Sequence, residues 1–582
     1  MTLTQMHLAY ALANFVEHAY FKGGLPQGVR SVIAGLVEAM QSGNVCSRPE
    51  DGQALGLLVA SGAASVLVGF QPSTLDTPLV VDGAGRLYLN RFYDYERLIA
   101  ARIRELVRNA PAPDFEALSR ALEATRLAFS DNGAANEQKI AVATAMLNPV
   151  SVISGGPGTG KTYTIAQIVL ALLALDPDMR IALATPTGKA ASRLTQGLAD
   201  MRERFEPFGS FSPQARTIHS LLHALRSETF DAIVVDEAGM VSLELMGRLF
   251  RSAKDTARFV LVGDKDQLAS VDEGAVFAEM SASCRFGEPR REALVRLGFG
   301  PDLPGEAPGG LPPSVLGEAT TWLTRTRRFD AAGGIARLAQ ATLAGEASQA
   351  VEILRSPSPG LAHAFFEDAA SYRQALWDKV LECFAPYADL VRETDASRQA
   401  GCDALFEAAL RNGVLVGLNE GDFGVEGLNA FVRRRLFADR PSSGERFEGE
   451  IILVTENDYA NGLFNGDVGI VVSKDGSLAA AFRETAPGKT GFRFINPMKL
   501  GHVRSAFAIT VHKSQGSEFE NVLLALPEKS RLLTREYFYT GITRAKKTLT
   551  VFASEESVRT AIATRQERTG GFLDRLEEAF GD

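Results

Sequence analysis

Apolar and polar positions along the chain change their spacing several times, and each change predicts a different kind of element. The first part of the chain carries a helical spacing of apolar residues in three stretches, 8–19, 29–40 and 95–107. Residues 86–90 instead resemble a short strand. Pro111-Ala112-Pro113 ends any continuing helix, because proline lacks the backbone donor and restricts the residue before it. The pattern predicts a mainly helical N-terminal domain over residues 1–113.

From residue 137 to about residue 299, the apolar positions fall in short runs, each followed by a helical stretch. These runs are residues 150–154, 181–184, 232–235 and 259–262. Apolar strands that alternate with helices are typical of a parallel sheet covered on both faces. Glycine and proline dominate residues 300–313, which predicts a linker or an exposed loop. We therefore place a first α/β domain over residues 114–315.

The remaining residues, 316–582, are predicted to form a second α/β domain with a small insertion. The insertion is indicated by short β-rich runs around Asn461-Gly462 and Asn465-Gly466, because Asn-Gly between such runs is a strong hairpin signal. Strand and helix patterns alternate again over residues 506–553. The predicted fold class is α/β, with a small β-barrel insertion at about residues 440–500 of the second domain.

Composition narrows the class of protein. Hydrophobic residues make up 46% of the chain and charged residues 23%, which is ordinary usage for a protein that folds in water. The longest apolar run, residues 168–175, is too short to span a bilayer, which takes about 20 residues. Met1–Glu17 has no basic stretch ahead of its apolar residues, and the four cysteines are far apart. We expect a cytoplasmic protein with reduced thiols and no membrane contact.

The net charge of −9, taken as a sum over the whole chain, argues against a polyanionic partner. Locally the balance is reversed: Thr321–Leu338 carries four Arg and one Asp, and Arg531–Lys547 carries five basic residues and one Glu. A protein that touches nucleic acid along a narrow track needs only such local clusters. The charge therefore predicts weak nonspecific duplex binding, not the absence of nucleic-acid binding.

A glycine-rich segment follows the first apolar strand of the 114–315 domain and precedes an apolar helix. It consists of Gly155, Gly156, Pro157, Gly158, Thr159, Gly160, Lys161 and Thr162, and it matches the phosphate-binding loop in full. In such a loop, backbone N–H groups hold the β-phosphate, Lys161 reaches the β and γ oxygens, and Thr162 binds Mg²⁺. The alternative is a glycine-rich turn without nucleotide. We expect ATP and Mg²⁺ to bind here.

Two further strand ends supply the remaining groups that ATP hydrolysis needs. Asp236 follows an apolar strand and is predicted to lie in the Mg²⁺ shell, and Glu237 is predicted to orient and deprotonate the attacking water. An Asp-Glu pair alone is usually the start of a solvated loop. Because a complete phosphate loop precedes this pair, a catalytic role is the favoured interpretation here. After the strand at residues 259–262, Gln267 is placed to hydrogen-bond the γ-phosphate or the water.

With these motifs in order, the chain resembles superfamily 1 helicases of the 5′-to-3′ branch, and among them the RecD family, the alpha subunit of exodeoxyribonuclease V. The resemblance continues through residues 137–139, 185–191, 217–219, 236–238, 263–268, 327–329, 510–516 and 539–545. Residues 87–91, 420–425 and 457–467 favour the RecD branch. The match covers most of the chain and is weakest before residue 85.

The resemblance implies two RecA-like domains with ATP in the cleft between them, and an SH3-like insertion. Gln138 is expected to read the adenine edge, and Arg328 and Arg544 to cross the cleft as arginine fingers. Gly516 and Glu518 are expected to border the ribose and phosphates. Without the motif context, a charged residue on the protein surface would be an equally good interpretation of Arg328.

The resemblance also implies a track for single-stranded DNA across both domains. The loops at residues 185–189, 217–219 and 510–514 are rich in hydroxyls and isolated bases, as phosphate contacts need. We expect Thr187, His219, Thr510 and His512 to lie on this track. Outside the motif context, the two histidines would more often cap a helix or pack in the core.

One departure from the related helicases concerns strand separation. Those proteins usually place a β-hairpin pin between the Thr-Ile-His segment and the Asp-Glu strand, whereas only residues 220–231 lie there in this chain. This segment is too short for a helix and a substantial hairpin. Movement along a strand that is already separated is therefore the firmer expectation.

These observations support three hypotheses. The leading one is an ATP-driven 5′-to-3′ motor on single-stranded DNA that processes double-strand ends together with RecB-like and RecC-like subunits. Its nuclease activity would come from a partner, because the acidic residues outside the ATPase motifs are scattered. The second is a nucleotide-regulated subunit that docks through the N-terminal domain, residues 1–113. The third is a stand-alone 5′-to-3′ repair helicase.

Overall fold

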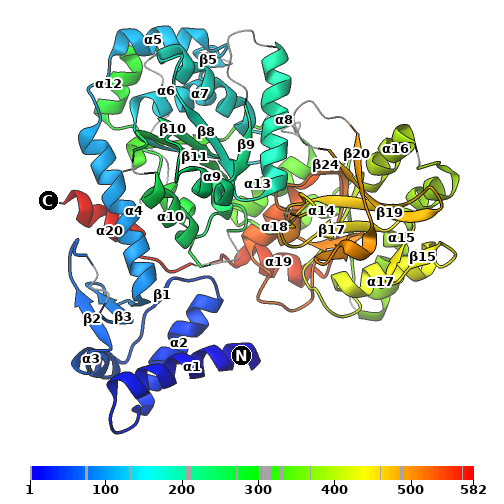
Figure 1. Ribbon diagram of the computed structural model, residues 1–582, viewed down its shortest axis with the longest axis horizontal. Helices are drawn as coiled ribbons and strands as arrows, with labels where there is room; N and C mark the ends of the chain where they lie inside the picture. The colour runs from blue at the N-terminus through cyan, green and yellow to red at the C-terminus, as the bar shows by residue number, and fades with distance from the viewer. Residues whose placement is uncertain are drawn as a thin grey trace.

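The structure is a computed structural model, and three bodies of secondary structure are visible in it (Figure 1). It describes residues 3–72, 76–131, 134–204, 213–253, 255–269, 273–274, 276–300, 303, 316–326, 333–366, 369–396, 398–458, 460–484, 491–566 and 568–581. Most of the predicted linker at residues 300–313 lies outside the described residues, and so does Arg328. None of the described helices is both long and apolar enough to cross a membrane.

The N-terminal body combines helices with a small sheet. Its helices are α1 (Leu3–Tyr20), α2 (Gln27–Gln41), α3 (Gly52–Ala60) and α4 (Asn90–Asn109), and its strands are β1 (Cys46–Ser47), β2 (Ala64–Leu67), β3 (Leu79–Asp82) and β4 (Leu87–Leu89). The strand order is β1-β4-β3-β2. The three predicted helices and the predicted strand β4 are confirmed, but the sheet has three further strands, which are too short to show a period of their own.

The first α/β body contains a parallel sheet of six strands in the order β12-β7-β11-β10-β8-β9. The strands are β7 (Val150–Gly155), β8 (Ile181–Thr185), β9 (Ala215–Thr217), β10 (Ala232–Val235), β11 (Arg258–Gly263) and β12 (Thr320–Leu323). The helices are α5 (Phe115–Ala124), α6 (Glu137–Leu147), α7 (Lys161–Leu175), α8 (Gly188–Arg204), α9 (Ile218–Ala224), α10 (Leu243–Ser252), α11 (Val276–Met280) and α12 (Glu288–Arg296). A short pair, β5 (Ser130–Asp131) and β6 (Ala134–Ala135), precedes α6.

Local chemistry explains where several of these helices begin. Asp114 accepts hydrogen bonds from the N–H groups of Glu116 and Ala117 and so caps α5, directly after the predicted Pro111-Ala112-Pro113 break. Asn136 caps α6 in the same way. The four predicted strands correspond to β7, β8, β10 and β11. The predicted boundary at residue 315 falls too early, because it would assign β12 to the second domain although β12 pairs with β7.

The second α/β body contains a parallel sheet of five strands in the order β13-β24-β23-β14-β22. The strands are β13 (Leu361–Phe365), β14 (Asn412–Val416), β22 (Ala508–Thr510), β23 (Phe519–Ala525) and β24 (Ala545–Ala553). The helices are α13 (Gly334–Ala344), α14 (Ala347–Arg355), α15 (Ala369–Glu393), α16 (Gln399–Ala409), α17 (Val425–Leu436), α18 (Arg535–Ile542) and α19 (Glu555–Ala563). The parallel sheet and its helices confirm the predicted second α/β domain.

The predicted β insertion interrupts this body between β14 and β22. A pair of short strands, β15 (Ser442–Ser443) and β16 (Arg446–Phe447), leads into it. Its antiparallel sheet has the order β20-β19-β18-β17-β21 and is built from β17 (Ile451–Val454), β18 (Val468–Lys474), β19 (Ser477–Arg483), β20 (Phe492–Ile495) and β21 (Val503–Ser505). A separate apolar core holds it together. Its SH3-like character stays a prediction.

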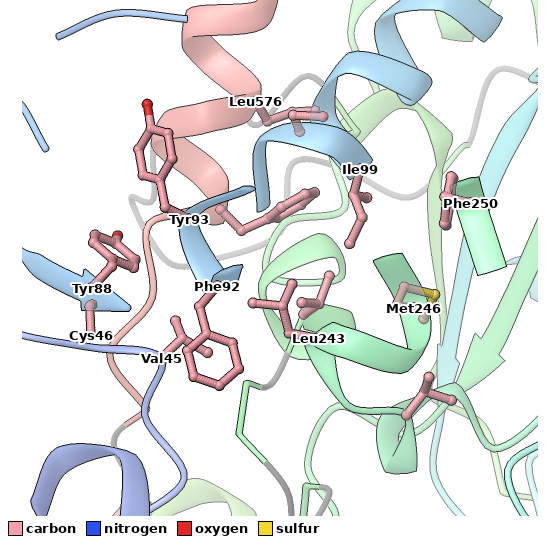
Figure 2. Packing of buried hydrophobic residues seen from close by; sticks show 14 of the residues in the cluster. Val45, Cys46, Tyr88, Phe92, Tyr93, Ile99, Leu243, Met246, Phe250 and Leu576 are labelled. Atoms are coloured by element: carbon pink, nitrogen blue, oxygen red, sulfur yellow. The ribbon is translucent and has the colours of Figure 1, made fainter. Parts of the chain in front are cut away.

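The last helix, α20 (Phe572–Phe580), leaves the second body and returns to the N-terminal one. Figure 1 shows α20, in red, beside the blue α4, and in Figure 2 Ile99 of α4 lies between Leu576 of α20 and Met246 of α10. These three side chains are fully buried in one apolar cluster. The C-terminal helix therefore joins three parts of the chain.

A group of ionisable side chains lies where this helix meets the N-terminal body; we call it the anchor cluster and define it as Asp82, Arg86, Glu96, Glu279 and Arg575. Asp82 Oδ2 lies 2.6 Å from Arg86 Nη2 and 3.4 Å from Arg575 Nη2. Glu96 Oε1 accepts a hydrogen bond of 2.9 Å from the N–H of Gly571, at the N-terminus of α20. Charge pairing and helix capping thus fix the position of α20.

Candidate active site

The phosphate loop connects β7 to α7 and has a backbone that only glycine adopts without strain. Gly158 and Gly160 have φ values of 79° and 87°, in the left-handed region. A Cβ atom at Gly160 would also collide with the side-chain amide of Gln138. Lys161 Nζ donates hydrogen bonds to the carbonyls of Gly155, at 2.7 Å, and Gly156, at 3.3 Å. The lysine therefore bends over the loop that it follows.

A cavity of about 360 Å³ opens above this loop, between the two α/β bodies. Of the residues predicted from the sequence, the cavity is lined by Gly156, Pro157, Gly158, Gly160, Lys161, Thr162, Asp236, Glu237, Gln267, Gly516, Glu518 and Arg544. The first nine come from the first α/β body and the last three from the second. The structure thus brings together groups that the sequence holds far apart.

Three of the predicted nucleotide-binding residues do not line this cavity. Gly155 and Thr159 line a neighbouring cavity of about 250 Å³ on the other side of the loop. Gln138 is buried behind the loop, where its Nε2 donates a hydrogen bond of 3.0 Å to the carbonyl of Thr159. Its Oε1 is buried without a hydrogen-bond partner among the described residues. That acceptor remains able to bind a donor from a ligand.

The acidic pair at the end of β10, in which Asp236 is buried and Glu237 half-buried, has unusual electrostatic and backbone conditions. Burial, and then the charge of Glu237, raise the pKa of Asp236 to about 6 from an ordinary 3.8. Asp236 Oδ1 accepts a hydrogen bond of 2.9 Å from the N–H of Glu237. Glu237 itself has a left-handed φ of 54°, which costs a residue other than glycine on the order of 1–3 kcal/mol. Backbone strain of this kind is concentrated at functional sites.

The loop after β11 forms hydrogen bonds with the second body. Gln267 Nε2 donates a hydrogen bond of 2.8 Å to Asp264 Oδ2, and burial raises the pKa of Asp264 to about 6. The next residue, Leu268, donates its N–H to Thr540 Oγ1 at 2.9 Å and accepts a hydrogen bond of 2.6 Å from Gln515 Nε2. Gln267 is thus held between the cavity and two segments of the second body.

Arg544 enters the cavity from the second body, and almost all of its side chain is buried. It donates hydrogen bonds to the carbonyls of Thr540, at 3.0 Å, and Ser517, at 3.2 Å. Burial lowers its pKa, and the charge of Glu237 acts in the opposite direction. A buried guanidinium held by neutral carbonyls retains its full charge for a ligand.

Five residues that line the cavity are absent from the predicted site: Tyr163, Ala190, Arg193, Leu194 and Met201. Arg193 lies on α8, and its Nη2 is 2.7 Å from Glu518 Oε1, across the cleft. Only one signal in the sequence could have suggested it: Arg193 follows Lys189 by one helical turn, after the Thr187 loop. Tyr163 directly follows the phosphate loop, but an aromatic residue there is equally typical of a helix core.

The four predicted DNA-track residues lie at the carboxyl ends of strands in both sheets. Thr187 precedes α8, and its Oγ1 accepts a hydrogen bond of 3.3 Å from the N–H of Ala190. His219 is exposed in the first turn of α9. In the second body, Thr510 is buried, and His512 is half-buried with a pKa lowered by burial and by Arg568. His219 is therefore the most accessible of the four and Thr510 the least.

A groove of about 570 Å³ runs beside these loops, between α8 and the β insertion. Its walls include Ser192 and Thr217 from the first body and Phe464 and Arg493 from the insertion. A Cβ atom at Gly188 would collide with Phe464, so the insertion approaches α8 as closely as glycine permits. Hydroxyl, aromatic and basic groups thus meet in one groove.

The described chain has no hairpin between α9 and β10. Residues 225–231 join the two elements directly, and the first sheet gains no strand there. The short connection agrees with the expectation from the sequence that this segment cannot hold a pin.

Comparisons with known proteins find two family models that match parts of the chain. The model of the AAA domain family matches residues 133–294, and the model of the UvrD-like helicase C-terminal domain matches residues 505–552. The RecBCD enzyme subunit RecD of Mycobacterium tuberculosis is 34% identical over 517 residues, which cover 84% of this chain and 80% of that protein. The subunit of the same name from Mycolicibacterium smegmatis is 32% identical and covers 95% of this chain and 94% of its own.

A more distant relative is the ATP-dependent RecD2 DNA helicase of Deinococcus radiodurans, which is 26% identical over 99% of this chain and 73% of that protein. The two family models fall on the two α/β bodies that face the cavity. Identity above 30% with the RecD subunits extends well beyond these two segments. The chain belongs to the RecD family of superfamily 1 DNA helicases.

Proposed function

We propose that this RecD-family helicase uses ATP and Mg²⁺ to move 5′-to-3′ along single-stranded DNA, as a subunit of a helicase–nuclease that processes double-strand ends. The observation that supports this most strongly is the shared cavity, in which Lys161, Glu237 and Arg544 meet from two bodies. A site divided between two bodies can couple hydrolysis to their relative movement.

Each side chain of the cavity has a distinct role in this proposal. Lys161 binds the β and γ oxygens of ATP, and Glu237 takes the proton of the attacking water. Gln267 orients that water or the γ-phosphate, through an amide that Asp264 holds in place. Arg544 stabilises the charge that develops on the transferring phosphoryl group.

A metal ion fits between the loop and β10. The hydroxyl of Thr162 and the carboxylate of Asp236 line the same cavity, and both are the hard oxygen donors that Mg²⁺ prefers. When bound there, Mg²⁺ neutralises negative charge on the phosphates. Burial raises the pKa of Asp236 to about 6, which is still below neutral pH, so this carboxylate remains able to bind a cation there.

Arg328 and Gln138 complete the proposed nucleotide site. Arg328 lies outside the described residues, so its role as a second arginine finger rests on its motif alone. For Gln138, the unpartnered Oε1 supports contact with the amino group of adenine, although the side chain does not line the cavity.

The proposed DNA track follows the groove between α8 and the β insertion. Thr187 and His219 lie at the ends of neighbouring parallel strands, and Thr510 and His512 continue the line on the second body. Phe464 offers a ring for base stacking and Arg493 a charge for phosphate. These contacts are independent of base sequence, as movement along DNA requires.

A second candidate function is a nucleotide-regulated docking subunit with little unwinding of its own. It is favoured by the direct connection between α9 and β10 and by exposed apolar side chains on α1, where Leu8 is 49%, Tyr10 65% and Phe15 53% exposed. RecB-like and RecC-like subunits are the proposed partners, and any nuclease activity belongs to one of them. The third candidate, a stand-alone 5′-to-3′ helicase, would stay monomeric when these subunits are present.

The test is the polarity of unwinding, measured for the chain alone and for the assembled complex. Duplexes with a 5′ or a 3′ single-stranded overhang are compared, with Lys161→Ala as the control that lacks turnover. The proposal expects ATP-dependent unwinding from the 5′ overhang that Lys161→Ala abolishes. Equal rates and polarity for complexes with the wild-type and Lys161→Ala chains would favour the docking subunit instead.

A further inference from the structure

Helix α8 carries two cations that cross the cleft to one short loop of the second body. Lys189 Nζ donates a hydrogen bond of 2.7 Å to Ser517 Oγ. One turn later, Arg193 Nη2 lies 2.7 Å from Glu518 Oε1, and Arg193 Nη1 donates to the carbonyl of Gly516 at 3.3 Å. Both cations therefore contact the loop Gly516–Glu518, and α8 faces the second body in Figure 1.

The carboxylate of Glu518 sits between cations from both bodies. Lys546 Nζ, from the second body, lies 3.5 Å from Glu518 Oε2. The side chain of Glu518 is only 9% exposed, whereas that of Arg193 is 46% exposed. An ion pair with a half-exposed arginine adds little to the stability of the protein. The effect of this contact is instead to fix the position of the Glu518 side chain.

The same arginine is close to the acidic pair of β10. Burial alone would lower the pKa of Arg193, but the charges of Glu518, Glu237 and Asp236 raise it above its ordinary value. Arg193, Glu237 and Glu518 also line the same cavity. Arg193 is thus placed between the catalytic carboxylates and the loop of the opposite body.

The other side of α8 forms a wall of the proposed DNA groove. Gly188, Ser192 and Thr195 line the groove, while Ala190 and Arg193 line the nucleotide cavity. One face of α8 therefore lines the groove, and another face of the same helix lines the cavity. A helix moves as a rigid element, so a contact on the groove side displaces the side chains on the cavity side.

We propose that Arg193 is a positioning residue that couples DNA binding to ATP turnover. It holds Glu518 and the loop Gly516–Glu518 against the nucleotide cavity, and DNA along α8 acts on turnover through this ion pair. The proposal rests on the proposed function, because it requires an ATPase that single-stranded DNA stimulates.

The experiment measures kcat and KM for ATP with and without single-stranded DNA, on the full chain. Arg193→Ala is expected to lower the stimulation of kcat by DNA about tenfold, a typical coupling for residues in contact. Arg193→Lys keeps a charge near Glu518 but loses the forked contact with Gly516, so it is expected to recover part of the stimulation. Melting temperatures of the variants show whether they fold.

A double-mutant cycle with Glu518→Gln tests the ion pair itself. If the two residues act as a unit, Arg193→Ala/Glu518→Gln lowers the stimulation no further than Arg193→Ala alone. The matched control is Arg120→Ala on α5, because Arg120 pairs with Glu116 at the same 2.7 Å, on an exposed helix away from the cleft. This control is expected to keep the full stimulation.

Two results would overturn the proposal while the proposed function stands. One is full stimulation of a folded Arg193→Ala protein. The other is a rise in KM for ATP that is the same with and without DNA, which would make Arg193 a simple nucleotide contact. If DNA fails to stimulate the wild-type protein, the proposed function falls first, and the coupling falls with it.

Discussion

The nucleotide cavity and the anchor cluster both bury acidic side chains, yet they differ in what surrounds those groups. In the cavity, burial raises the pKa of Asp236 to about 6 from 3.8. In the anchor cluster, burial, and then the charge of Glu279, raise the pKa of Glu96 to about 8 from 4.5. The larger departure thus occurs in the anchor cluster, away from the nucleotide cavity.

The surroundings of the two groups differ. Asp236 faces an opening of about 360 Å³, which Lys161 and Arg193 also line, and the charges of both act on it. In the anchor cluster, Asp82 is paired with Arg86 and Arg575, and Glu96 caps α20. A raised pKa therefore indicates burial alone, whereas burial beside an opening lined by a phosphate loop indicates a binding site.

The largest effect is expected when the proposed base in the cavity is removed. Glu237→Gln keeps the shape of the side chain but not its basicity, so ATP turnover is expected to fall by about 10²–10⁴-fold while nucleotide binding persists. Turnover and binding of a fluorescent ATP analogue measure the two effects. The matched change in the anchor cluster, Glu96→Gln, is expected to leave turnover unchanged. Equal loss in both variants would remove the distinction between the two regions.

The next effect concerns the stability of the anchor cluster. Arg575→Ala leaves Asp82 buried beside one cation instead of two, and breaking a buried pair typically costs about 3–5 kcal/mol. We expect a lower melting temperature and cleavage of the C-terminal segment by a protease, with nucleotide binding retained at low temperature. A C-terminal segment as resistant as in the wild-type protein would show that α20 is held by its apolar contacts alone.

The smallest effect is a pH dependence of the same anchor. The folded pKa values of Glu96 and Glu279 are raised to about 8 and about 7, above an ordinary 4.5. Between pH 4.5 and about pH 8, the folded protein binds more protons than the unfolded chain. The free energy of unfolding is therefore highest below about pH 4.5 and falls as the pH rises toward 8. Hydrogen-exchange protection of α20 is expected to be lower at about pH 9 than at about pH 6.

Glu96→Gln is the control for this pH dependence, because glutamine keeps the acceptor for the N–H of Gly571 but does not titrate. Protection of α20 in this variant is expected to change less with pH. The same pH dependence in the variant and the wild-type protein would assign the titration to another group.

In the first α/β body, the apolar pattern of the sequence predicts the strands that are apolar along their length. It does not predict the strands that carry polar residues. β7, β8, β10 and β11 are buried along their whole length except at Arg258, so each produces a clear apolar run. The strand β9 is only half-buried, and Thr320 and Thr321 of β12 are buried because their hydroxyls find partners within the fold. Thr321, for example, accepts its hydrogen bond from Arg290, and a bond between residues so far apart leaves no period in the sequence.

The same distinction holds for the turns and for the site. The tight hairpin of the insertion lies at Asp475-Gly476, whereas the two Asn-Gly pairs shape the longer connection between β17 and β18. Motif residues such as Lys161 and Asp236 could be predicted because each lies beside the strand that presents it. Arg193 could not, because its partner Glu518 belongs to the other body.

The central claim is that the cavity hydrolyses ATP under the control of single-stranded DNA. ATP turnover of the wild-type and Lys161→Ala proteins, with and without single-stranded DNA, tests it most directly. The account predicts turnover that DNA stimulates in the wild-type protein, and turnover lowered by about 10²-fold or more in a Lys161→Ala protein that melts at the same temperature. Hydrolysis by Lys161→Ala at the wild-type rate would contradict it.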